Sequence, residues 1–166
     1  NLNSTNNGTS APPVFYTKGN ITVSAPNGGQ TFQVGNNTTI SWSKKGNFAL
    51  VNLSYSWNGT DYTAIDGGTG ISSTGSPWLW NISLTTTTST TAKVKVSQYA
   101  NDENVKDTSD NYFNVTGRID LSQPNDSGIV LNYTGAATGN TYNIIWSKDG
   151  GIDTVNLSYS TNGVDW

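Results

Sequence analysis

Apolar and polar side chains alternate in short runs along most of this chain, and no run has the roughly 3.6-residue spacing of a helix. Ile21 and Val23, for example, flank the polar Thr22. The same alternation recurs over residues 40–42, 51–55, 78–84, 93–96 and 113–115. Residues two apart on a strand share a face, so each run predicts a strand with one buried face. The pattern predicts seven or eight short strands over residues 20–116, which is typical of an all-β sandwich.

Part of this pattern occurs twice. Residues 51–62 return as residues 155–166, with nine of the twelve positions identical. The match extends upstream, pairing residues 41–44 with 145–148 and residues 21–27 with 119–125. The first two matches are offset by 104 residues and the last by 98, which indicates a six-residue insertion between the first two strands of the second copy. A duplication whose insertion is confined to a turn region predicts a tandem array of similar units.

The repeat divides the chain into three parts. Residues 1–19 are rich in Asn, Ser, Thr and Gly and are predicted to form a flexible arm. Residues 20–116 are predicted to form one complete sandwich, and residues 117–166 the first half of a second, truncated one. Half a sandwich would leave its aromatic rings in water, so we expect the missing strands to lie further along the same chain or to come from a neighbour.

Composition excludes several classes of function. The chain has no Cys and no His, which removes disulfides, Cys–His metal sites and His-based catalytic triads. Only 11% of the residues are charged, the net charge is −3, and the eight basic residues are scattered, whereas nucleic-acid binding needs a clustered basic face. No apolar run approaches the roughly 20 residues of a membrane span. We therefore expect no enzyme, no cofactor, no nucleic-acid partner and no membrane span in this segment.

Glycosylation acceptors are numerous. An Asn/Ser/Thr-rich chain makes N-x-S/T sequons by chance, but six of these asparagines fall on the outward face of the predicted strands, where a glycan can be carried. This placement favours an extracellular, glycosylated protein, and together with the absence of Cys it favours an archaeal or bacterial surface. The sequons are at Asn3, Asn7, Asn20, Asn36, Asn37, Asn52, Asn58, Asn81, Asn114, Asn125, Asn132 and Asn156.

Several segments together resemble a known repeat. They are residues 21–29 with their Pro-Asn-Gly-Gly turn, residues 34–42, residues 51–59 with their Asn-Gly turn, residues 78–80, residues 93–97 and residues 107–115. These residues are similar to an Ig-like repeat of archaeal and bacterial cell-surface proteins, and to the N-terminal Ig-like domain of fungal Ser/Thr-rich cell-wall proteins. The resemblance implies tandem Ig-like (fibronectin III-like) antiparallel β-sandwiches, used as spacer or surface-layer modules without shared catalytic residues.

Four acidic residues gather before the last predicted strand: Asp102, Glu103, Asp107 and Asp110. Ca²⁺ prefers several oxygen ligands, so the group is a weak calcium candidate. The spacing fits no EF-hand loop, and Asp also caps turns in solvated loops. We favour the solvated loop.

Two aromatic residues stand apart from the predicted core. Sugars stack on exposed rings, but Trp42, Trp80 and Trp146 occupy inward positions. Trp57 lies beside a predicted hairpin, where the second copy has Thr161, so the fold does not require it. Trp57 and Tyr62 could form a small surface contact, and the alternative is a lone exposed ring.

Two polar segments leave alternatives open. The Thr-rich run at residues 85–91 is either O-glycosylated or a polar loop leading into the next strand. Within the arm, Val14, Phe15 and Tyr16 favour a strand, and they could add to the sheet edge of a neighbouring subunit. The alternative is that they pack on their own unit or act as a linker.

Taken together, the sequence predicts a structural extracellular protein of the cell surface. It would be the repeat unit of a surface filament, surface layer or stalk, carrying covalent glycans and self-assembling with identical subunits. The competing prediction is an adhesin or a carbohydrate-binding accessory module of a larger secreted protein.

Overall fold

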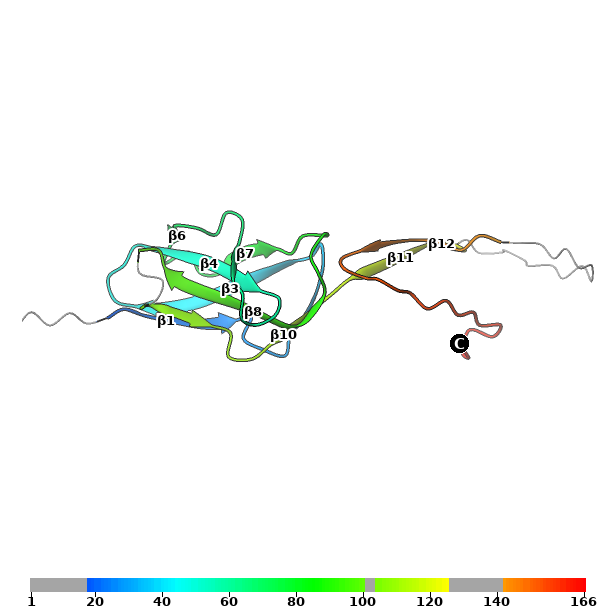
Figure 1. Cartoon of the computed structure of the whole chain (residues 1–166), viewed down its shortest axis with the longest axis horizontal. Coiled ribbons are helices and arrows are strands. Elements are labelled where there is room, and N and C mark those ends of the chain that lie inside the picture. Colours follow the sequence, from blue (N-terminus) through cyan, green and yellow to red (C-terminus); the bar gives the residue numbers. More distant parts are fainter. Residues whose placement is uncertain (1–17, 101–103, 126–141) are drawn as a thin grey trace, which may run out of the picture.

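The computed structural model describes residues 18–100, 104–125 and 142–166. The described residues hold strands and no helix, so the all-β prediction is confirmed. Two sheets form the first unit, residues 20–116 (Figure 1). The smaller sheet has the order β1-β3-β7, with bounds Asn20–Ala25, Asn37–Lys45 and Trp78–Asn81. The larger sheet has the order β2-β10-β8-β4-β5, with bounds Thr31–Gln33, Phe113–Thr116, Ser89–Gln98, Leu50–Ser56 and Thr63–Ala64.

Two more short strands join the larger sheet. β6 (Ile71–Ser72) pairs with β4, and β9 (Lys106–Thr108) pairs with β8. The described part of the first unit therefore has ten strands rather than seven or eight. The sheets are also not wholly antiparallel, because β2 runs parallel to β10. The alternation pattern missed β6 and β9 because strands of two or three residues are too short to show a period.

The core lies between the two sheets and consists of the inward side chains that the alternation predicted. Both rows of apolar residues are at most 5% exposed, which matches a sandwich interior filled from two faces. The smaller sheet and its continuation contribute Ile21, Val23, Ile40, Trp42, Trp80 and Ile82, and the larger sheet contributes Val51, Leu53, Val94, Val96, Phe113 and Val115. Phe48 and Val105, which no alternating run contains, are buried as well.

Polar groups inside this core have hydrogen-bond partners. The indole Nε1 of Trp42 donates to the carbonyl of Ser73 at 3.1 Å. The buried hydroxyl of Ser109 donates to the carbonyl of Pro26 at 2.7 Å and accepts from the amide of Val94 at 3.1 Å. Buried polar atoms are tolerated when they are paired in this way, and these bonds connect loops to strands of the core.

The hairpin after β4 has the predicted Asn-Gly turn. Gly59 adopts a φ of 82°, a conformation that glycine takes at little cost. The side-chain oxygen of Asn58 accepts hydrogen bonds from the amides of Thr60 and Asp61, both at 2.9 Å. The side-chain nitrogen of Asn58 also donates to the Asp61 carboxylate at 2.6 Å. These local bonds explain why this dipeptide turns the chain toward β5.

The second unit begins with β11 (Arg118–Gln123) and β12 (Ile145–Asp149), which form a two-stranded antiparallel sheet. Their register is that of β1 and β3. Leu121 pairs with Trp146 as Val23 pairs with Trp42, and a bulge follows at the same position in both pairs. The duplication in sequence is therefore a duplication in structure for these two strands.

Residues 150–166 differ from their counterparts. Alternation predicted a strand over residues 155–159, like β4, but the structure assigns no strand there. In the first unit β4 is held by β8, β5 and β6. The described residues of the second unit contain no equivalent of β8, so the 155–159 segment has no ladder to join. The alternation of Ile129, Leu131 and Tyr133 predicts a further strand, and these residues lie outside the described part of the chain.

Candidate functional site

A cluster of aromatic rings lies beside the open edge of β7. The ring of Trp57 is 4.4 Å from Tyr55 and 6.0 Å from Trp80, measured between ring centroids. Trp80 is itself 6.5 Å from Phe113, in an edge-to-face arrangement. Trp57 is thus half-buried and attached to the core rather than standing free.

This cluster forms one wall of a cavity of about 490 Å³. Polar residues share the lining, including Asp66, Ser83 and Thr86. Aromatic faces next to carboxylate and hydroxyl groups match a sugar ring, which has apolar C–H faces and a polar rim. In the second copy Thr161 stands at the position of Trp57, so that copy has no aromatic ring at this place. We define Tyr55, Trp57, Trp78, Trp80 and Asp66 as the aromatic groove.

Tyr62 belongs to a different environment. The ammonium of Lys95 lies 5.1 Å from the centre of its ring. Burial raises the pKa of the Tyr62 phenol above its ordinary value of 10.0, while a side-chain hydrogen bond with Thr108 acts in the opposite direction. Trp57 packs on the rings of Tyr55 and Trp80, whereas the ring of Tyr62 lies against Lys95, so the two residues of the predicted contact belong to two different ring clusters.

The sequon asparagines in the described part of the chain are all accessible. Seven are exposed, and Asn52 and Asn114 are half-buried. Three others, Asn3, Asn7 and Asn132, lie outside the described residues. The sites differ in what a glycan would disturb. The Asn58 amide is part of the hairpin turn, and the Asn81 amide donates to Asn37, another sequon, at 2.9 Å.

The described acidic residues of the calcium candidate are engaged in hydrogen bonds to the fold. The carboxylate of Asp107 accepts from the amide of Val23 at 2.8 Å, and so joins β9 to β1. The carboxylate of Asp110 accepts from the Asn27 side chain at 2.8 Å. Asp102 and Glu103 lie outside the described residues. Among the residues that the structure describes, no three acidic side chains gather as metal ligands would.

The Thr-rich run begins in a loop and ends in β8. Ser89 and Thr91 are the first part of that strand, and both hydroxyls donate to the carbonyl of Trp57. Thr86 lines the aromatic groove, and the neighbouring Thr87 lies against the second unit at Gly151. The run therefore connects the groove with the junction between the units, a role that its composition did not suggest.

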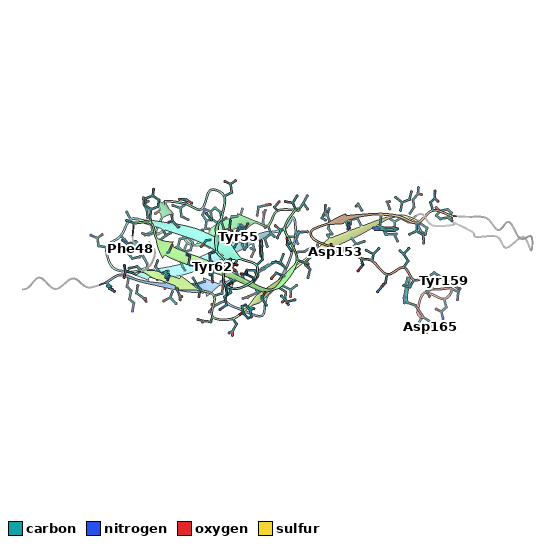
Figure 2. The ribbon with its side chains drawn as sticks, viewed as in Figure 1. Phe48, Tyr55, Tyr62, Asp153, Tyr159 and Asp165 are labelled. Carbon is teal, nitrogen blue, oxygen red and sulfur yellow. The ribbon has the colours of Figure 1, made fainter. Side chains whose placement is uncertain are left out.

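The second unit has an open apolar face. Its strands and the 155–159 segment enclose a cavity of about 630 Å³. Trp146 is 37% exposed, Leu157 60% and Tyr159 82%, whereas their counterparts Trp42 and Leu53 are 5% and 0% exposed. Figure 2 shows Tyr159 on the segment that runs beside the β11–β12 ribbon. Half a sandwich was expected to leave its aromatic rings in water, and among the described residues the rings of Trp146 and Tyr159 are exposed. Val14, Phe15 and Tyr16 lie outside the described residues.

Comparisons with protein-family models, with curated proteins and with solved structures gave no match to this chain. The part of the chain that the structure describes contains no helix of the length and apolarity that crossing a membrane requires.

Proposed function

We propose that this protein is a structural repeat protein of the cell surface, built from Ig-like (fibronectin III-like) sandwiches and forming part of an extracellular filament, surface layer or stalk. The observation that carries the proposal is the repeated β1–β3 and β11–β12 pairing, with the same register and bulge in both units. Repetition of one scaffold without a repeated reactive site suits a mechanical role. No catalytic role is proposed.

The strand order supports the Ig-like part of the proposal. When immunoglobulin strands are lettered in chain order, β1, β3 and β7 take the places of strands A, B and E, and β4, β8 and β10 those of C, F and G. The accessible sequons and the low content of charged residues support an extracellular surface covered by glycans.

Self-assembly is the testable core of this function. We expect the purified full chain to form ordered rods, filaments or sheets as its concentration rises, visible by electron microscopy and as large species in analytical ultracentrifugation.

Deleting residues 1–19 is expected to shorten these assemblies and lower their heat resistance, because the arm would bridge subunits by adding a strand to a sheet edge. Assemblies of unchanged length and heat resistance would contradict the bridging role. A monodisperse full chain at every concentration would contradict self-assembly itself.

The aromatic groove favours one alternative function, binding of a carbohydrate. Trp57→Thr introduces the residue that the second copy carries and removes one aromatic wall. If the groove binds a sugar, this variant should lose about fivefold or more in affinity, since stacking on one ring contributes on the order of 1 kcal/mol. Titration against a glycan array measures the change, with Tyr62→Ala as control because Tyr62 lies in the other cluster. Equal binding by both variants and the unchanged protein would exclude the groove.

A further inference from the structure

The two units meet at a junction with a single residue between their strands. β10 ends at Thr116, β11 begins at Arg118, and only Gly117 separates them. Figure 1 shows the β11–β12 ribbon continuing from one end of the first unit, along the long axis of the picture. A connection this short leaves the chain little freedom, so contacts across it can fix the orientation of the second unit.

Contacts across the junction involve backbone on both sides. The amide of Gly150 donates to the carbonyl of Leu84 at 2.7 Å. A Cβ on Gly150 would lie 3.2 Å from Val34 and 3.3 Å from the carbonyl oxygen of Thr86. We call this end of the first unit, formed by Val34, Leu84, Thr86 and Thr87, the tail surface. The second unit presents the turn after β12, which includes Gly150 and Gly151.

The same turn occurs in the first unit, after β3. Gly19, Gly46 and Phe48 correspond to Gly117, Gly150 and Ile152. Gly46 and Gly150 both have positive φ, 100° and 80°. A Cβ on Gly46 would lie 2.8 Å from the Cα of Gly19, and a Cβ on Gly150 would lie 3.1 Å from the Cα of Gly117.

A shared hydrogen bond also closes both turns. In the first unit the ammonium of Lys44 donates to the carbonyl of Phe48 at 2.7 Å. In the second unit the ammonium of Lys148 donates to the carbonyl of Ile152. We call Lys18, Gly19, Gly46 and Asn47 the head surface of the first unit. It lies at the opposite end of the unit from the junction, since Figure 2 places Phe48 at one end and Asp153 beyond the other.

The head surface differs from the turn at the junction in one residue that bears on a similar contact. Asn47 is exposed and stands where the second unit has Gly151, so a similar contact would have to accommodate a side chain at this position. A Cβ on Gly151 would lie 3.4 Å from the Cα of Thr87 and 3.6 Å from its Cγ2, which is ordinary van der Waals contact. The bond from Gly150 to Leu84 joins two backbone groups, so it does not depend on the side chains present.

The residues that lead into the first unit also resemble those that leave it. Phe15 and Gly19 stand 98 residues before Phe113 and Gly117, the offset that relates the first strands of the two units. The segment that leads into the first unit therefore shares part of its sequence pattern with the segment that leads from the first unit into the second.

We propose that the head surface of the first unit docks on the tail surface of another unit of this fold, with the geometry of the junction at Gly117. The occupant is a unit carrying a loop like residues 84–88. A heterologous contact of this kind repeats without closing and so stacks units end to end into a stiff rod. The inference deepens the proposed function, because it rests on the tandem array and names the surface through which its units are held.

Spin-label distances in a lengthened chain test the proposal. A second copy of residues 20–117 is inserted ahead of Asn20, which creates a junction of the native length. The chain has no Cys, so labels can be placed at Ser43→Cys in both copies, and in the original chain at Ser43→Cys and Ser147→Cys, two exposed counterparts. The two distance distributions should share one mean and one narrow width. A flexible joint would instead broaden the new distribution at least about twofold.

One substitution at two places provides a matched control. We call the inserted copy the outer copy, and the copy that continues into Arg118 the inner copy. Asn47→Trp in the inner copy is expected to broaden the distance distribution about twofold, because it keeps the inner head surface away from Thr87 of the outer copy. The same change in the outer copy is expected to have no effect. A broad distribution in the lengthened chain, or a narrow one that the inner Trp leaves unchanged, would overturn the proposal. Because the distances are measured in dilute, unassembled protein, either result is independent of the self-assembly test.

Discussion

Appending a second copy of residues 63–116 after Trp166 is expected to close the second unit and bury its open apolar face. Trp166 corresponds to Tyr62, so residue 63 continues the repeat in register. The appended segment supplies equivalents of β5 to β10, including the strands that cover Trp42 and Leu53 in the first unit. Burying a Leu or Ile side chain contributes about 1.5–3 kcal/mol, so the face as a whole is worth on the order of 5–10 kcal/mol before entropy costs.

Hydrogen exchange measures this closure residue by residue. Amides of residues 145–149 and 155–159 should gain protection of at least about a hundredfold, because they would enter ladders like those of β3 and β4. The matched control appends the same segment with Val94→Asp and Val96→Asp in the added copy, since both valines are fully buried in the first unit. If residues 155–159 exchange equally fast in both chains, the second unit is not the beginning of the same sandwich.

Trp80→Ala is expected to be the most damaging single substitution within the first unit. Trp80 is only 4% exposed, and its ring contacts those of Tyr55, Trp57 and Phe113. Replacing a buried Trp by Ala costs about 3–5 kcal/mol through lost burial and the cavity left behind. Because a domain is commonly stable by only about 5–15 kcal/mol, this change removes a large share of the free energy of unfolding.

Urea denaturation followed by circular dichroism measures the loss of unfolding free energy in Trp80→Ala without relying on tryptophan fluorescence. Trp57→Ala is the informative comparison, because Trp57 belongs to the same cluster but is only half-buried and is replaced in the repeat. Its cost should be clearly smaller than that of Trp80→Ala. Equal losses for the two variants would show that Trp57 is as much a part of the core as Trp80.

The candidate surfaces were only partly predictable. A comparison of the two copies was enough to single out Trp57 as a residue that the fold does not require, because Thr161 stands at the equivalent position. Its neighbours could not be found in this way, since Trp80 lies 23 positions further along the chain and joins Trp57 only when the sheets pack. For the same reason the sequence grouped Trp57 with Tyr62, although Tyr62 contacts Lys95 and Thr108 instead.

The junction was missed as well, although a signal was present. Gly46 and Gly150 occupy the same place in the repeat, and a conserved turn glycine within one chain can mark a close backbone approach. What the sequence lacked was the other side of the contact. Thr87 belongs to the Thr-rich run and Leu84 directly precedes it, and this segment has no counterpart among the described residues of the second unit.

The sequence by itself determined the class of structure, the positions of the longer strands and most residues of the core, although not Phe48 and Val105. Alternation of apolar and polar side chains is a property of neighbours two residues apart, so it can be read without knowing the fold. Tertiary structure alone decided that β2 runs parallel to β10, that Trp57 joins the core and that Gly150 meets Leu84. Each of these depends on segments distant in sequence, whose pairing is selected by packing of the whole sandwich rather than by local preference.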